Sequence, residues 1–120
     1  MIETEKFKVV GEETRLRILR VLVKADIGLC ECEIIDILQK PQYNISKHLN
    51  ILKRSGLIKD KRYGRKIIYS LVKSNKLNIK IFEAVKLIKT ESDIVFRDDY
   101  RILGERLKKR INGKCDNRCC

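Results

Sequence analysis

The spacing of the apolar residues changes at Gly56, and that change restricts the chain to a small set of folds. Before it, Ile45, Leu49 and Leu52 recur at helical intervals. They predict a helix over Gln42–Ser55 with one narrow buried stripe. After it, the apolar residues alternate, as they do in strands. We therefore expect a helix that leads directly into a pair of strands.

The predicted strand pair is a β-hairpin. Two candidate strands, Leu57–Arg62 and Lys66–Val72, flank the segment Tyr63-Gly64-Arg65. The second strand is rich in β-branched and aromatic side chains. The glycine of the connecting segment can adopt the positive φ that a tight hairpin turn needs. We expect this hairpin, residues 57–72, to form a wing beside the preceding helix.

Amphipathic patterns predict further helices on both sides of this unit. In a helix over Glu12–Lys24, the leucines and valines share one face, and Arg17 and Arg20 belong to the polar surface. The whole pattern predicts a mainly α fold with a small β-hairpin, as one domain over 1–112 followed by a cysteine-rich tail over 113–120. The other predicted helices are Glu3–Val10, Glu31–Leu38, 75–89 and 94–112.

Basic residues are concentrated in the predicted helix and wing. The net charge is +12, and the segment 39–73 holds ten basic residues and one acidic residue. The phosphate backbone of DNA attracts such a block. The element order is that of a winged helix-turn-helix, whose second helix enters the major groove. A solvated surface or an anionic membrane surface would also explain the charge, but no strongly apolar helix face accompanies it.

Features of the whole chain narrow the class of protein. No stretch approaches the about 20 apolar residues of a membrane span. The first residues lack the profile of a secretion signal, so we expect a cytoplasmic protein. The sequence has one histidine and shows neither a nucleophile–base pair nor a glycine-rich phosphate loop. We therefore do not expect an enzyme. The five cysteines form two clusters, which indicates metal binding or redox chemistry rather than a disulfide framework.

Five short motifs follow one another along the chain. They are Thr14-Arg-Leu-Arg-Ile-Leu19, Gly28-Leu-Cys-Glu-Cys32, Ile45-Ser-Lys-His-Leu49, Leu52-Lys-Arg-Ser-Gly-Leu-Ile58, and Gly64-Arg65-Lys66 followed by Tyr69-Ser-Leu71. Together they cover about Val9 to Val72 and resemble the signatures of the ArsR/SmtB (arsenic-repressor) family. The resemblance implies a homodimeric repressor that binds an inverted-repeat DNA operator and leaves it when a metal or metalloid binds.

The resemblance also implies where the dimer forms. In this family the first helix and the helix after the wing make the interface. We therefore assign to it the apolar stripe of the predicted helix 75–89, which consists of Leu77, Ile81, Val85 and Ile88. The same stripe fits an ordinary intramolecular core, and the two roles are compatible.

The polar residues of the helix over Gln42–Ser55, which we call the reading helix, are candidates for contact with DNA. The N-terminal half of such a helix meets base edges, where Gln and Asn can pair with adenine and Lys with guanine. The basic residues that follow are expected on phosphates and Tyr63 on a sugar. For His48 we favour polar packing or a phosphate contact over metal binding. The candidates are Gln42, Tyr43, Asn44, Ser46, Lys47, His48, Lys53, Arg54, Arg62, Tyr63, Arg65 and Lys66.

Cys30 and Cys32 resemble the family's Cys-x-Cys site for As(III), Sb(III) and other soft ions. Thiolates suit soft ions, and the start of a helix stabilises them. The arsenic-responsive pattern has a third cysteine where this chain has Ile35. The expected effector is As(III), with Cd(II), Pb(II), Zn(II) or Cu(I) as other possibilities. Further thiolates would come from the tail, in cis or in trans, through Cys115, Cys119 and Cys120.

Other interpretations stay open at this point. The paired cysteines would also fit as small buried apolar residues, and the tail as an inert terminus. Disulfides between the two clusters would make the protein a redox-sensing regulator. A basic adaptor could use the same fold to bind protein or RNA. The family's second kind of metal site, built from His and carboxylates on the helix after the wing, is excluded because no histidine follows His48.

Overall fold

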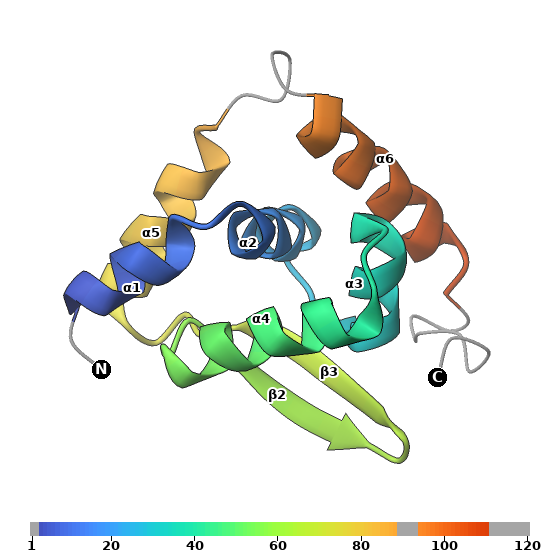
Figure 1. Cartoon of the computed structure of the whole chain (residues 1–120), viewed down its shortest axis with the longest axis horizontal. Coiled ribbons are helices and arrows are strands. Elements are labelled where there is room, and N and C mark those ends of the chain that lie inside the picture. The colour runs from blue at the N-terminus through green and yellow to red at the C-terminus, as the bar shows by residue number, and fades with distance from the viewer. Residues whose placement is uncertain (1–2, 89–93, 111–120) are drawn as a thin grey trace.

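The computed structural model describes residues 3–88 and 94–110, and the statements below concern those residues. Their helices are grouped around one central helix, and the β-hairpin of a small antiparallel sheet lies at one edge of the molecule, as Figure 1 shows. The elements are α1 (Glu3–Val10), α2 (Glu13–Ala25), β1 (Leu29–Cys30), α3 (Glu31–Leu38), α4 (Gln42–Arg54), β2 (Ile58–Tyr63), β3 (Lys66–Leu71), α5 (Lys76–Lys86) and α6 (Ile94–Lys108). None of these helices is long and apolar enough to cross a membrane.

Helix α2 is the centre of the fold. In Figure 1 it lies in the middle of the view, with α1 and α5 on one side and α3 and α6 on the other. Its Ile18, Leu19 and Leu22 are buried in the core, together with apolar residues of α3, α4 and α5. Burial of these side chains is the main favourable term that holds the helices together.

The predicted stripe of α4 is confirmed, because Ile45, Leu49 and Leu52 are all fully buried. Pro41 precedes the helix in extended conformation, which suits a position where no intrahelical N–H bond is lost. The helix ends one residue earlier than predicted, and Gly56 follows with a φ of 82°. Helices α3 and α4 thus form the helix-turn-helix.

The wing is confirmed as a tight hairpin. Tyr63 pairs with Lys66, so Gly64 and Arg65 alone make the turn. Gly64 has a φ of 61°, as a glycine at the first position of such a turn requires. Strand β2 therefore reaches one residue further than the sequence predicted.

A third strand, β1, was not predicted. It pairs antiparallel with β3, through Leu29 with Tyr69 and Cys30 with Ile68, which gives the sheet order β1-β3-β2. The approach is close, since a Cβ at Gly28 would lie 2.6 Å from Ile68 Cγ2. Pairing with β3 thus anchors the segment that leads into α3.

Helix α6 corrects the predicted surface of α2. Arg17 and Arg20 are buried rather than exposed, because α6 packs against α2 and supplies partners for both. Arg17 forms a two-point ion pair with Asp99, and Arg20 donates to the hydroxyl of Tyr100. Helix α5 is shorter than predicted, and residues 89, 111 and 112 of the predicted C-terminal helices lie outside the described residues.

Replacement of Asn78 by alanine is expected to lower the free energy of unfolding by about 3 kcal/mol, because three buried polar groups lose their partner. Asn78 is fully buried and accepts from Lys6 Nζ at 2.8 Å. It also donates to the carbonyls of Gly56 and Val72, at 2.9 and 3.1 Å. Urea denaturation measures the effect. The exposed Lys80→Ala is the control, and equal stability of the two variants would contradict this role.

Candidate nucleic-acid interface and thiol site

The candidate residues of α4 fall on an outer and an inner side of the helix. Gln42, Tyr43 and Lys47 are exposed, with Tyr43 78% accessible. Lys53 and Arg54 are exposed in the last turn, where Lys53 pairs with Asp60 of β2 at 3.0 Å. The exposed side is therefore a basic and amide-bearing surface of the kind that binds DNA.

Two candidates in the first half of α4 are only partly accessible. Ser46 is half-buried and donates from its hydroxyl to a carboxylate oxygen of Glu31, the first residue of α3. Asn44 is also half-buried, and its Oδ1 is buried with no hydrogen-bond partner within the described residues. Pairing with adenine requires both polar atoms of the amide. Asn44 would therefore have to change rotamer to pair in that way.

The wing continues the basic surface of α4. In Figure 1 the hairpin lies on the same side of the molecule as α4. Arg62, Tyr63 and Arg65 are exposed, and Lys66 is half-buried. Tyr63 is 55% accessible and lies under the Lys61 ammonium, which is 5.2 Å from the ring centroid. The wing and α4, which carry the predicted base-contacting and phosphate-contacting residues, thus lie on the same side of the molecule.

His48 does not belong to this face, because its side chain is buried. Its Nδ1 lies 3.1 Å from a guanidinium nitrogen of Arg15 and 3.7 Å from a carboxylate oxygen of Glu12. Burial lowers the pKa of His48, and the charges of Arg15, Lys47 and Lys40 lower it further against the opposing effect of Glu12. We therefore remove His48 from the predicted DNA contacts and assign it to the packing of α4 on α2.

Acidification is expected to destabilise the protein through His48. Because its pKa is lowered in the folded state from the usual 6.5, the unfolded chain binds more protons between that lowered pKa and pH 6.5. The free energy of unfolding should thus fall as the pH drops through this window. Urea denaturation at pH 7.5 and 5.5 measures the fall, which should be smaller in His48→Gln. The same fall in both proteins would contradict this.

Cys30 and Cys32 lie together where β1 meets α3. Cys30 is fully buried and Cys32 half-buried, and their sulfurs are 2.8 Å apart, farther than the about 2.05 Å of a covalent disulfide. Within residues 3–88 and 94–110, no three His, Cys, Asp or Glu side chains are grouped to hold a metal ion. The predicted ligands Cys115, Cys119 and Cys120 lie outside the described residues.

Arg110, which follows α6, is linked to the thiol pair through Glu33. The guanidinium of Arg110 donates to both carboxylate oxygens of Glu33, at 2.9 and 2.6 Å, and to the carbonyl of Gly28 at 2.9 Å. The same carboxylate accepts from the backbone N–H of Cys30 at 3.0 Å. Sequence analysis missed this link because Glu33 and Arg110 are 77 residues apart. The guanidinium of Arg110, the last described residue, is therefore linked through one carboxylate to the backbone of Cys30.

The four residues of the predicted dimer stripe differ in their exposure to solvent. Ile81 and Val85 are buried in the core, while Leu77 is half-buried and Ile88 is 37% accessible. The buried pair thus has the intramolecular role that the sequence left open. Other large apolar side chains on α1, on α5 and at the end of α5 are exposed, namely Phe7, Ile79 and Leu87.

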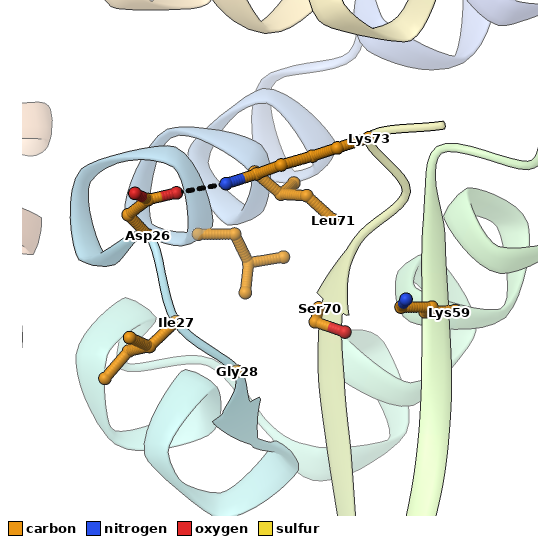
Figure 2. Close-up of a pocket in the computed structure, with 8 residues that line it drawn as sticks. Asp26, Ile27, Gly28, Lys59, Ser70, Leu71 and Lys73 are labelled. Carbon is orange, nitrogen blue, oxygen red and sulfur yellow. Dashed lines mark hydrogen bonds and ion pairs between the residues drawn. The ribbon is translucent and has the colours of Figure 1, made fainter. Parts of the chain in front are cut away.

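An open hollow of about 220 Å³ lies between α2 and the wing. Leu22 and Leu71 are among its lining residues. Asp26 and Lys73, which also line it, form an ion pair, as Figure 2 shows. The hydrogen bond and charge of Lys73 lower the pKa of the Asp26 carboxyl. None of the predicted DNA-contacting or metal-binding residues lines this hollow.

Known proteins are similar to this chain over more than half of its length. Residues 12–60 match the family described as bacterial regulatory protein, arsR family. The chain is 42% identical over 84 residues to an HTH-type transcriptional regulator of Methanocaldococcus jannaschii, covering 70% of this chain and 88% of that one. It is 38% identical over 72 residues to the arsenical resistance operon repressor of Escherichia coli, covering 59% of this chain and 60% of the repressor.

Another relative and a solved structure extend the comparison. The cadmium resistance transcriptional regulatory protein CadC of Listeria innocua is 37% identical over 81 residues, which cover 68% of this chain and 63% of CadC. The chain thus spans about three fifths of the E. coli and Listeria proteins. HlyU from Vibrio cholerae superposes with a TM-score of 0.61 at 28% identity, over 68% of this chain and 85% of HlyU.

Proposed function

Since the chain belongs to the arsR family of bacterial regulatory proteins, we propose that it represses transcription and that a soft metal or metalloid ion releases it from DNA. Members of this family are DNA-binding transcriptional regulators rather than enzymes, and their fold is the winged helix-turn-helix. The observation that carries the proposal is the position of the Cys30/Cys32 pair at the start of α3, the helix that packs against the reading helix α4.

The exposed face of α4 and the wing supports binding to an inverted-repeat operator. Gln42, Tyr43 and Lys47 are exposed and would meet base edges, while the exposed Arg62 and Arg65 would contact the phosphate backbone. Two such faces on a homodimer would meet half-sites about 34–36 Å apart. The proposed dimer contact consists of Leu77 and Ile88 from the predicted stripe, together with the exposed Phe7 and Leu87.

The thiol pair supports a soft ion as the signal. Thiolates prefer As(III), Sb(III), Cd(II), Pb(II), Zn(II) and Cu(I) over hard ions, and two sulfurs already in contact can hold one ion together. The E. coli relative is an arsenical resistance repressor and the Listeria relative a cadmium resistance regulator. Two sulfurs do not complete a three- or four-coordinate site, so we include Cys115, Cys119 and Cys120 among the ligands.

The position of Arg110 favours ligation by the tail in cis. Arg110 is bonded to Gly28 and Glu33, next to the thiol pair. Cys115 follows five residues later, and an extended chain spans at most about 3.6 Å per residue, or roughly 18 Å over five residues. A tail that starts beside Cys30 can therefore fold back onto it within one protomer.

Native mass spectrometry of the reduced dimer tests this proposal. As(III), Cd(II) and Zn(II) are added one at a time, and thiolate-to-metal absorbance is followed in parallel. We expect one bound ion per protomer and weaker binding after removal of residues 114–120. A chain that binds none of these ions at micromolar concentration would refute the proposal. Mixed dimers of full-length and truncated chains distinguish ligation in cis from ligation in trans.

One observation favours a thiol-redox regulator as the second candidate. The sulfurs of Cys30 and Cys32 are already in contact at 2.8 Å, so oxidation would need little movement. HlyU of Vibrio cholerae, the structural relative above, has been solved in a form described as reduced. If this candidate holds, an oxidant in metal-free buffer changes the affinity for DNA and dithiothreitol restores it. An affinity for DNA that the oxidant does not change would refute this candidate.

A further inference from the structure

Glu31 stands between the two cysteines, in the first turn of α3. Its side chain leaves that turn toward α4 and accepts a hydrogen bond from Ser46 on the reading helix. This bond directly connects a side chain of the Cys-Glu-Cys segment with the DNA-facing helix. Ser46 is half-buried, so its hydroxyl lies at the border between the protein interior and the DNA-facing surface.

The carboxylate of Glu31 also influences the wing. Burial raises the pKa of Tyr69 on β3 to about 12, and the negative charge of Glu31 adds to that shift. Tyr69 is buried and pairs with Leu29, the residue before Cys30. Glu31 therefore lies where α3, the reading helix and the central strand of the sheet come together.

A second carboxylate, Glu33, also holds this turn of α3. The carboxylate of Glu33 accepts hydrogen bonds from Arg110, two residues beyond the end of α6, and from the backbone N–H of Cys30. A turn held at Glu33 cannot rearrange around a bound ion without moving the other residues in it. Glu31 is the sequence neighbour of both cysteines. A movement of the cysteines around an ion would therefore displace the Glu31 side chain, which faces the reading helix, most directly.

The serine hydroxyl has two competing uses. It has one proton to donate, so when it donates to Glu31 it cannot donate to a DNA phosphate or base. A bond to a carboxylate is charge-assisted and stronger than one to a neutral acceptor. A change at the thiol pair that strengthens or breaks this bond would change what α4 presents to DNA.

On the basis of the function proposed above, we propose that Glu31 is the positioning residue that couples ion binding at Cys30 and Cys32 to the reading helix, through its hydrogen bond with Ser46. Glu31 itself is not a ligand, and it does not contact DNA. Replacement of Glu31 should leave the affinity for the ion nearly unchanged. It should reduce the factor by which the ion changes DNA affinity, measured against the DNA affinity of the ion-free protein.

The test uses full-length reduced protein and a fluorescent DNA duplex that the wild-type protein selects from a random pool. Anisotropy gives the Kd for the duplex with and without Cd(II), and absorbance gives the affinity for Cd(II) alone. In the wild type, Cd(II) should weaken DNA binding at least tenfold. In Glu31→Gln and in Ser46→Ala, the ratio of the Kd with Cd(II) to the Kd without it should fall below about threefold. The affinity of each variant for Cd(II) should stay within threefold of the wild type.

A double variant and a control complete the design. If the two residues act as one unit, Glu31→Gln combined with Ser46→Ala loses no more coupling than either change alone. Glu105→Gln removes an exposed carboxylate of α6 that bonds only to Arg101 in the described contacts, and it should keep the wild-type ratio. Circular dichroism confirms that each variant is folded, and Ser46→Ala carries the test if Glu31→Gln does not fold.

Two negative results have different meanings. If both variants keep the full wild-type ratio, the role of Glu31 is overturned and the proposed function stands. If neither Cd(II) nor As(III) changes DNA binding in the wild type, the proposed function fails, and the role of Glu31 fails with it.

Discussion

Replacement of Asp99 by alanine is expected to lower the free energy of unfolding by about 3–5 kcal/mol, because it removes one half of a buried two-point ion pair with the guanidinium of Arg17. The two residues form a two-point ion pair, with Arg17 Nε 2.9 Å and Nη2 2.8 Å from the carboxylate oxygens. Asp99 is only 2% accessible. Arg17 also donates to the carbonyl of Leu38 at 3.0 Å, so the pair joins α2, the end of α3 and α6.

The neighbouring residue is a matched control for this prediction. Asp98 is on the same turn of α6 but exposed, with Arg101 at 3.9 Å. Asp98→Ala should change the free energy of unfolding by less than about 0.5 kcal/mol. Urea denaturation followed by circular dichroism measures both variants. Equal stabilities would mean that the Arg17–Asp99 pair does not hold α6 in place.

Neutralising the wing is expected to weaken DNA binding on the order of 100-fold at 0.15 M salt, because three phosphate contacts and their released counterions are lost. The variant is Arg62→Gln, Arg65→Gln and Lys66→Gln together. The loss should be nearly the same for every duplex sequence, because phosphate contacts carry no sequence information. In a plot of log K against log salt, the slope should fall by about 3 per protomer.

A second triple variant controls for the change in net charge. Lys80, Arg101 and Lys108 are exposed on α5 and α6, which are not among the predicted DNA-contacting elements. Their replacement by glutamine removes the same charge and should weaken binding less than about tenfold, through the long-range field alone. Anisotropy at several salt concentrations measures both variants. If the two lose affinity equally, the wing does not contact the DNA backbone.

Local patterns predicted the helix-turn-helix and wing well. The stripe of Ile45, Leu49 and Leu52 is buried as expected, and Gly64 has the expected positive φ. These features depend on residues a few positions apart, so the sequence alone contains the information. The bounds of α3 were predicted for the same reason.

Contacts between distant segments were not predicted. Arg17 and Arg20 look like surface residues of an amphipathic helix, and only the docking of α6 buries them. Strand β1 has two residues, too few to show alternation, and it exists because β3 lies beside it. His48 lies at an inward position of α4, where Arg15 and Glu12 of α2 receive it.

The candidate site was predicted in its parts but not in its connections. The sequence identified Cys30, Cys32 and Ser46 as separate candidates. It gave no sign that Glu31 would bond to Ser46, or that Arg110 would bond to Glu33 beside the thiols. Such side-chain links depend on helix packing, which the spacing of residues along one helix does not encode.

The central claim is that an ion at Cys30 and Cys32 releases the protein from DNA. The most direct measurement is the anisotropy of the selected duplex bound to reduced protein during titration with As(III) or Cd(II), for the wild type and for Cys30→Ser with Cys32→Ser. In the wild type, we expect either ion to raise the Kd for the duplex at least tenfold. The double variant should bind the duplex with the wild-type Kd, and neither ion should change that Kd. A double variant that still responds fully to either ion would contradict the account.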